Sequence, residues 1–320
     1  ESLQVASGDA EEVLRIRKNL SKSSVTKYQA MDRAVCSDGR IRGVLQFYGA
    51  NRTGRWAGRL VQVQNLPHDV PRAIDTARHL VKAKNRRGLE LMYGDVASTL
   101  SQLIRTAFIA PEDAMLCVSD FSAIEARVLS WLAGEKWRMD VFANNGDIYC
   151  ASASSMFGVP VVKHGINGHL RQKGKVAELA LGYQGGPNAL ISMGALKMGL
   201  TEEELPDIVR RWRSSNPRIQ DFWYAVDGAA MSVGLPHGII FSRECNLLYG
   251  YDYLTITLPS GRRLFYPQPY VGENQFGRPA IHYKTQLGAS WTYTSTYGGK
   301  LVENITQAIA RDCLALALNR

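Results

Sequence analysis

The chain has 320 residues, of which 45% are hydrophobic, and its formal net charge is +9. This length fits about two globular domains, and the basic charge favours an anionic partner such as nucleic acid. No apolar stretch approaches the ~18 residues of a membrane span, and the sequence does not open on a signal peptide, so we expect no membrane partner. Five cysteines form no C-x-x-C pair, and several lie in apolar runs, which predicts reduced core thiols of a cytosolic protein.

The first 132 residues predict mainly helices. In chain order the expected elements are a helix at 10–20, an irregular Arg- and Gly-rich stretch at 40–66, helices at 71–84 and 96–108, an apolar strand at Met115–Ser119, and a helix at Ala123–Leu132.

The second half of the chain changes from helices to strands. Residues 134–245 have a mostly helical pattern that glycines and prolines interrupt. Tyr253–Leu258 alternates with period two, a Pro-Ser-Gly turn follows, and Arg262–Tyr266 is a second strand, so a β-hairpin is expected. A last helix is expected at 301–318. This order predicts an α+β fold with a helical insertion inside a sheet domain.

Asp120 directly follows the expected apolar strand, where its carboxylate would face a cleft and could hold a metal ion for phosphoryl transfer. An alternative is purely structural, because an acid after a strand often caps the next helix. Ser122 and Glu125 have the spacing of a capping box. Glu125 is therefore either a capping partner or part of a nucleotide pocket.

Arg171, Lys175, Leu179 and Tyr183 follow one another at four-residue steps. On a helix they form a slanting stripe ~18 Å long, about the reach of a nucleoside triphosphate and the base beyond it. The two cations could clamp phosphates, Lys175 could protonate a leaving pyrophosphate, and Tyr183 could stack on a base. Gly174 would then allow close approach to a ligand. The alternative is a solvated basic face on which Lys175 pairs with Glu178.

These segments, in their order, resemble family A DNA polymerases, the bacterial polymerase I and phage type. The segments that carry the resemblance are T-G-R at 53–55, Q-N-L-P at 64–67, R-T-A-F-I-A-P-E-D at 105–113, D-F-S-A-I-E-A-R at 120–127, G-D-I-Y at 146–149, R-Q-K-G-K-V-A-E-L-A-L-G-Y at 171–183, S-G-R-R-L at 260–264 and E-N-I-T-Q-A-I-A-R-D at 303–312. The resemblance implies a right-hand polymerase fold, with an antiparallel palm sheet and a mainly helical fingers insertion. Residues 1–39 would be a remnant of the thumb or palm base, 40–133 the first part of the palm, 134–250 the fingers, and 251–320 the second part of the palm.

The resemblance also implies roles at the nucleotide. Asp120 would be a ligand of two catalytic Mg²⁺ ions, helped by the Phe121 carbonyl, and Glu125 would exclude a ribose 2′-OH. Arg171 and Lys175 would bind the triphosphate, and Lys175 would also be catalytic. Two departures from the family pattern lie here. Tyr149 replaces a histidine that contacts phosphate, and Leu179 replaces an aromatic residue beside the sugar.

The implied partners are primer-template DNA and deoxynucleoside triphosphates. Tyr183 would lie by the template base, Gln307 near the primer terminus, and Arg55, Gln64 and Asn65 in the minor groove of the duplex. The implied location is the cytoplasm of a bacterial or phage-infected cell, and the sequence does not identify processivity partners.

The last motif of the family, V-H-D-E, which supplies the second metal carboxylate, is absent from the 320 residues. We therefore expect a truncated polymerase that binds primer-template without extending it. Two alternatives stay open at this point. One is a non-catalytic module that binds nucleic acid or nucleotide, and the other is a single-subunit RNA polymerase, which a ribose-excluding Glu125 disfavours.

Overall fold

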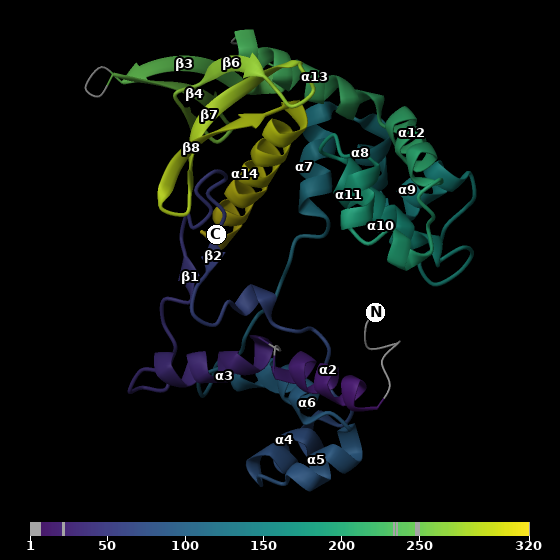
Figure 1. Ribbon diagram of the computed structural model, residues 1–320, viewed down its shortest axis with the longest axis vertical. Helices are drawn as coiled ribbons and strands as arrows, with labels where there is room; N and C mark the ends of the chain where they lie inside the picture. Colours follow the sequence, from purple (N-terminus) through teal and green to yellow (C-terminus); the bar gives the residue numbers. More distant parts are fainter. Residues whose placement is uncertain (1–7, 21–22, 233, 235, 247–249, 320) are drawn as a thin grey trace. The chain divides into compact units, whose positions relative to one another are not determined.

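A computed structural model describes residues 8–20, 23–232, 234, 236–246 and 250–319 (Figure 1). The chain divides into two compact units. Unit 1 comprises Glu1–Ala50 and Trp56–Asp120, and unit 2 comprises Asn51–Arg55 and Phe121–Arg320. The short strap 51–55 therefore belongs to unit 2, although both of its flanks belong to unit 1.

Unit 1 is helical apart from one two-residue strand pair. Its elements are α2 (Asp9–Leu20), α3 (Ser23–Ala34), β1 (Leu45–Gln46), β2 (Ala57–Gly58), the 3-10 helix η1 (Val63–Asn65), α4 (Ile74–Lys82), α5 (Arg86–Tyr93), α6 (Val96–Leu103) and the 3-10 helix η2 (Ile104–Ala107). Asn85 and Asp95 cap α5 and α6, because each side chain accepts a hydrogen bond from a backbone N–H of the first turn. A small core around Met31, Val61 and Ile104 holds the unit together.

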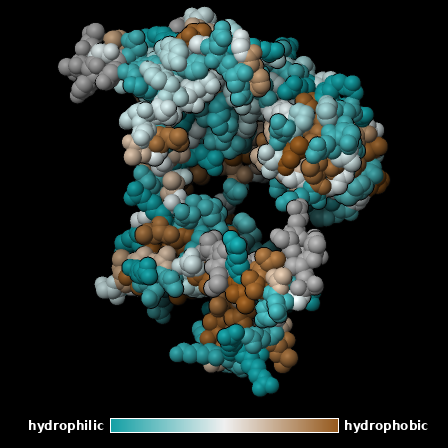
Figure 2. All heavy atoms as spheres, in the orientation of Figure 1, coloured by the Kyte–Doolittle hydropathy of each residue, from teal (hydrophilic) through white to brown (hydrophobic). Residues whose placement is uncertain are grey.

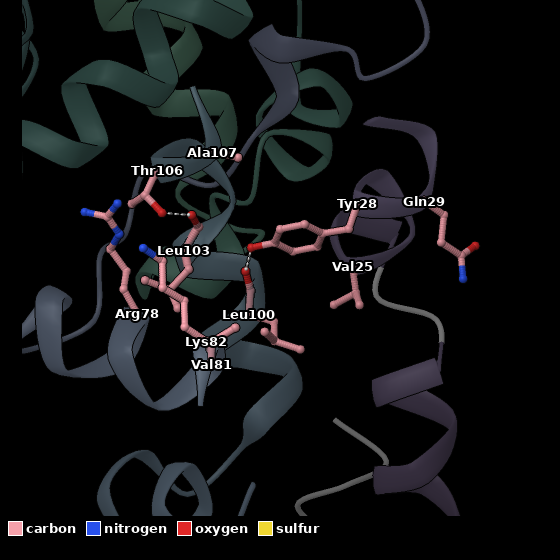
Figure 3. Close-up of a pocket in the computed structure, with 10 residues that line it drawn as sticks. All are labelled: Val25, Tyr28, Gln29, Arg78, Val81, Lys82, Leu100, Leu103, Thr106 and Ala107. Carbon is pink, nitrogen blue, oxygen red and sulfur yellow. Dashed lines mark hydrogen bonds between the residues drawn. The ribbon is translucent and has the colours of Figure 1, made fainter. Parts of the chain in front are cut away.

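A pocket of about 450 Å³ lies in unit 1 between α3 and the helices α4 and α6 (Figure 3). Tyr28 of α3 reaches across it and donates a hydrogen bond to the Leu100 carbonyl at 2.8 Å. Partial burial raises the pKa of the Tyr28 phenol, so the group stays a donor at neutral pH. The hydrophobic surface of this unit, brown in Figure 2, gathers around α6. None of the residues that the sequence singled out as functional lines this pocket.

Unit 2 begins with a run of helices. They are α7 (Ile124–Ala133), α8 (Lys136–Ala143), α9 (Ile148–Phe157), α10 (Leu170–Leu181), α11 (Pro187–Ser192), the 3-10 helix η3 (Leu196–Met198), α12 (Leu205–Ser215), α13 (Pro217–Ser232) and the 3-10 helix η4 (Pro236–Gly238). Trp212 and Trp223 stack with ring centroids 6.3 Å apart, and both side chains are buried. These aromatic side chains form part of one core that runs from α7 to the last helix.

Two antiparallel three-stranded sheets follow, in the orders β3-β4-β5 and β6-β7-β8. The strands are β3 (Ile240–Asn246), β4 (Tyr251–Thr257), β5 (Arg263–Pro267), β6 (Tyr270–Glu273), β7 (Pro279–Leu287) and β8 (Ser290–Thr296). Tyr266 of β5 packs edge-on against Tyr283 of β7, with ring centroids 4.9 Å apart. The final helix α14 (Gly298–Leu318) packs against α13 and α7 and contributes Leu301 and Ile305 to the core.

The predicted α+β class and the hairpin are confirmed, since β4 pairs with β5 around the turn at Gly261. The expected strand Met115–Ser119 is wrong, because none of the described strands pairs with it. Met115 and Val118 are 82% and 93% exposed. An apolar run becomes a strand only where a neighbour accepts its backbone hydrogen bonds, and composition does not supply that neighbour.

The five cysteines are free, as expected. The expectation that they are core thiols is wrong for four of them, because only Cys150 is buried. In the part of the chain that the structure describes, no helix is long and apolar enough to cross a membrane.

Candidate functional site

Three of the predicted residues meet at the start of α7. The helix has Ala123 at its N-cap, in a left-handed conformation with φ 49°, and no side chain caps it. The capping box between Ser122 and Glu125 is therefore not formed. Glu125 instead accepts a hydrogen bond from the Tyr183 hydroxyl at 3.1 Å and lies 3.6 Å from the Arg55 guanidinium. The arrangement holds an ionisable carboxylate, one-third exposed, between a phenol and a cation.

Tyr183 is a hydrogen-bond donor throughout the physiological pH range. Burial raises the pKa of its phenol, and the negative charge of Glu125 raises it further. The ring packs against the main core, while the hydroxyl points to the carboxylate. The stripe on α10 thus ends in a fixed aromatic residue rather than in a mobile one.

The strap 51–55 places Arg55. The Arg52 guanidinium lies 4.5 Å from the Tyr266 ring centroid and 4.6 Å from that of Tyr283, so it is held between two aromatic rings. The Gly54 carbonyl accepts a hydrogen bond at 3.0 Å from Arg311, whose side chain is buried in α14. Sheet and helix together fix the strap, and Arg55 extends from it with about half of its side chain exposed.

A buried polar network fixes the inner face of α10. Glu178 accepts a bidentate ion pair from Arg138, and it also accepts hydrogen bonds from Ser152 at 2.7 Å and from the Trp212 indole at 3.0 Å. The Arg138 and Glu178 side chains are 0% and 2% exposed. The network joins α8, α9, α10 and α12. The alternative in which Glu178 pairs with Lys175 on a solvated face is wrong, because Glu178 points inward.

Gly174 allows α9 and α10 to pack closely. A Cβ atom at this position would lie 2.1 Å from the Tyr149 carbonyl oxygen and 3.0 Å from the Ala153 Cβ. The expectation that Gly174 admits a ligand is therefore wrong: the close neighbour is the backbone of α9.

Arg171 is held at the N-terminal end of α10. Its Nε donates to Asp147 Oδ2 at 2.6 Å, and its guanidinium lies 5.2 Å from the centroid of the Tyr149 ring. Burial raises the pKa of the Asp147 carboxyl, but hydrogen bonds from Arg171 and from the backbone N–H groups of Cys150 and Tyr149 outweigh it, so this pKa lies below its usual range. Asp147 thus both caps α9 and orients Arg171.

Lys175 and Leu179 continue the stripe along α10. Lys175 is half-buried and Leu179 is 45% exposed, while their neighbours Val176, Ala177 and Ala180 are in the core. One side of α10 is therefore packed, and the side that carries the stripe is open. The predicted spacing of Arg171, Lys175 and Leu179 on one helix is found as expected.

The remaining predicted residues have the following local surroundings. Asp120 and Phe121 are exposed in a segment without regular structure. Gln64 and Asn65 lie in η1, and Asn65 donates a hydrogen bond to Gln62 at 3.2 Å. Gln307 lies in α14 and donates a hydrogen bond to Glu303 at 3.3 Å.

The residues described here do not form a complete metal site. Among them, no group of three or more His, Cys, Asp or Glu side chains lies close enough to hold an ion. Asp120 and the Phe121 carbonyl would supply two oxygen ligands, fewer than the six of an octahedral Mg²⁺ ion. His164 and His169, which sequence reasoning considered as zinc ligands and rejected, likewise belong to no such group.

Sequence reasoning missed three residues that position the site. Asp147 was part of a recognised motif, but its pairing with Arg171 depends on how α9 and α10 pack. Arg138 and Glu178 gave one signal, because Glu178 lies among Val176, Ala177, Ala180 and Leu181 and so on the apolar side of its helix. A charge at such a position is expected to have a buried partner.

Comparison with known proteins identifies the fold and the family. The model of "DNA polymerase family A" matches residues 2–246. The DNA polymerase of Bacillus phage SP02 is 55% identical over 317 residues, which cover 96% of this chain and 48% of the phage protein. The thermostable DNA polymerase I of Thermus aquaticus is 32% identical over 125 residues, covering 39% of this chain and 14% of that protein. The chain thus spans about half the length of the phage relative.

A solved structure has the same fold. It is the POL domain of Pol1 from M. smegmatis in complex with DNA primer-template and dNTP, which matches 95% of this chain and 38% of its own with a TM-score of 0.50 and 17% sequence identity. The antiparallel sheets and the helical run of unit 2 are thus those of a polymerase domain. With a family model that matches most of its length, the chain belongs to DNA polymerase family A.

Proposed function

We propose that this chain is the part of a DNA-directed DNA polymerase that binds the incoming nucleotide and the primer-template. The observation that carries the proposal is the construction of α10. One side is locked into the core by the Arg138–Glu178 network, and the open side carries Arg171, Lys175 and Leu179. A rigid helix with ordered cations on one face is suited to a triphosphate, whose recognition depends on positioning and electrostatics.

In this proposal Arg171 and Lys175 bind the triphosphate, and Lys175 donates a proton to the leaving pyrophosphate. The Tyr149 hydroxyl donates one hydrogen bond to a phosphate oxygen, in place of a histidine. Leu179 contacts the sugar, and Glu125 excludes a 2′-OH. The hydrogen bond from Tyr183 supports this role of Glu125, because it fixes the carboxylate at one position beside the template-base residue.

The proposed DNA contacts are Arg55, Gln64 and Asn65 in the minor groove and Gln307 near the primer terminus. Half of the Arg55 side chain is exposed, and the strap behind it is fixed, which suits a contact that reads position along a duplex. The partners are primer-template DNA and deoxynucleoside triphosphates, the role is DNA replication, and the cytoplasm is the proposed site of action.

The proposed metal is Mg²⁺, with Asp120 and the Phe121 carbonyl among its ligands. Because the described residues supply too few ligands for a site of their own, binding rather than turnover is proposed for this chain. The same observation favours the second candidate, a module that binds nucleic acid and nucleotide without catalysis. Family membership disfavours the third, a single-subunit RNA polymerase.

The proposal is tested by nucleotide binding. We expect the chain, mixed with a primer-template, to bind the deoxynucleotide that matches the template base more tightly than a mismatched one. Lys175→Gln is expected to weaken the matched nucleotide about tenfold, since a charge-assisted contact is worth ~1.5–3 kcal/mol. Lys173→Gln is the matched control, because residue 173 lies about 160° away around the same helix, with its Nζ 5.9 Å from the Phe157 ring centroid. Equal affinity for matched and mismatched nucleotides would overturn the proposal.

Magnesium-dependent primer extension separates the two candidates. Bound primer-template without extension, in wild type and Asp120→Ala alike, supports a binding role for these residues. Extension that Asp120→Ala abolishes would show that further ligands complete the metal site. Extension that Asp120→Ala leaves unchanged would contradict the role given to Asp120.

A further inference from the structure

The sheet β6-β7-β8 has one face in the core and one in solvent. Register places Tyr270 opposite His282, Lys284 opposite Tyr293 and Gln286 opposite Trp291, so these side chains share one face. The other face carries Ile281, which is 1% exposed. Trp291 and Tyr293, by contrast, are 61% and 46% exposed, and Tyr270 is 47% exposed. We call the solvent side the aromatic face; its residues are Tyr270, His282, Lys284, Trp291 and Tyr293.

The rings of the aromatic face are ordered against one another. Tyr270 stacks on His282 with centroids 4.9 Å apart and an interplanar angle of 15°. Tyr270 also meets Tyr293 edge-on at 5.3 Å, although β6 and β8 are separated by β7 and thus stand ~10 Å apart. Both rings therefore lean over the middle strand. Lys284 Nζ lies 5.6 Å from the Tyr293 ring centroid.

We propose that the aromatic face binds single-stranded nucleic acid by stacking unpaired bases on its rings. The occupant to which we commit is the unpaired template strand, so the identity of the strand rests on the proposed function. Each base has a π face, and stacking on an exposed aromatic side chain is worth ~1–3 kcal/mol per base. The aromatic face offers rings rather than aliphatic side chains, which suits planar bases.

The charges around the aromatic face complement a phosphate backbone. Lys284 lies on it, and Arg278 is exposed in the turn between β6 and β7. Arg243 of β3 donates a hydrogen bond to the Pro269 carbonyl at 3.1 Å, which holds its charge beside the start of β6. The only carboxylate among the strand residues 270–296 is Glu273, which alternation places on the opposite side from Tyr270.

The spacing of the rings also suits stacked bases. Trp291 and Tyr293 are two residues apart on β8, which separates their Cα atoms by ~7 Å. This is about twice the 3.4 Å rise of stacked nucleotides. One base therefore fits between the two rings, and the outer face of Trp291 is open for the next.

The direct test is binding of a fluorescein-labelled oligothymidylate, followed by fluorescence anisotropy at fixed salt without nucleotide or metal. The double variant Trp291→Ala/Tyr293→Ala is expected to weaken binding about tenfold or more. Tyr293→Phe, which keeps the ring, should bind like wild type. The matched control is Tyr224→Ala, an exposed tyrosine of α13 that is 63% accessible and remote in sequence from the sheet. Equal binding by wild type and double variant would overturn the proposal.

Two further measurements keep the result clear. Far-ultraviolet circular dichroism establishes that the double variant is folded, and Trp291→Phe provides a milder change if it is not. Sedimentation tests another occupant: a dimer that Trp291→Ala dissociates, without any effect on oligothymidylate binding, would mean that a second copy covers the face and would overturn the proposal.

The outcome is independent of the polymerase assay. A chain that binds oligothymidylate through Trp291 and Tyr293 but does not prefer a matched nucleotide would retain the aromatic face and overturn only the proposed function. On primer-template, wild type should gain affinity as the unpaired template is lengthened. The double variant should lose that gain and still bind a blunt duplex normally.

Discussion

The Tyr183 hydroxyl donates a hydrogen bond to Glu125 Oε2 across 3.1 Å, and this bond joins the end of α10 to the first turn of α7. The residue proposed to lie at the template base and the residue proposed to test the sugar are therefore mechanically linked. Arg55, at 3.6 Å, is the second partner of Glu125 and comes from the strap 51–55. Sugar recognition and DNA contact thus share one carboxylate.

Removing the Tyr183 hydroxyl should reduce discrimination between deoxy- and ribonucleotides. Tyr183→Phe keeps the packed ring but removes the donor, which leaves Glu125 with Arg55 as its remaining printed partner in a more open arrangement. We expect the ratio of dissociation constants for ribo- and deoxynucleoside triphosphate, measured with primer-template present, to fall about five- to tenfold. Tyr224→Phe on α13 should leave the ratio unchanged. An unchanged ratio in Tyr183→Phe would mean that Glu125 does not depend on this bond.

Two glycine substitutions should have opposite effects on stability. Gly174→Ala would place its Cβ 2.1 Å from the Tyr149 carbonyl, so the packing of α9 on α10 must shift at a cost of about 1–3 kcal/mol. Gly228→Ala in α13 meets no atom within 4 Å and should gain up to about 1 kcal/mol from helix propensity. Urea denaturation measures both. Equal effects would show that the α9–α10 contact is looser than the distances indicate.

The buried Arg138–Glu178 pair should be essential to the helical part of unit 2. Arg138→Met leaves the Glu178 carboxylate buried without its cation, which costs about 3–5 kcal/mol in comparable cases. The control is Arg86→Met, because Arg86 pairs with Glu90 on an exposed helix face and should contribute little. Thermal unfolding followed by circular dichroism compares the two variants. A loss in Arg138→Met no larger than in the control would contradict the role of the network.

Asp147 should make stability depend on pH at the acid end. Its pKa is lowered in the folded chain, so its charge stabilises the fold above the unfolded value of about 3.9 and ceases to do so as pH falls through the lower folded value. Asp147→Asn keeps a capping side chain but removes the ion pair with Arg171. We expect about 0.5–1.5 kcal/mol less stability at pH 7, and a difference from wild type that shrinks below about pH 4.

Urea denaturation at several pH values measures this difference. Asp207→Asn provides the control, since Asp207 pairs with Arg211 at 2.5 Å on an exposed helix face and should change stability little. A difference between wild type and Asp147→Asn that stays constant from pH 7 to pH 3 would show that the charge on Asp147 is not the cause.

The sequence by itself determined the α+β class, the hairpin around Gly261, the last helix and the placing of Arg171, Lys175 and Leu179 on one helix. These features follow from local periodicity and from turn residues, which act over a few positions. The family also followed from motifs in the sequence, and the family model confirms it.

Only the tertiary structure decided how the stripe on α10 is supported. Glu178 turns inward to Arg138, which lies 40 residues away, and Gly174 packs on α9 rather than on a ligand. The contact of Tyr183 with Glu125 spans 58 residues. Met115–Ser119 shows the same limit in reverse, because a strand needs a partner that its own residues do not specify. Pairing between distant segments depends on how whole helices and sheets pack, and no local pattern encodes it.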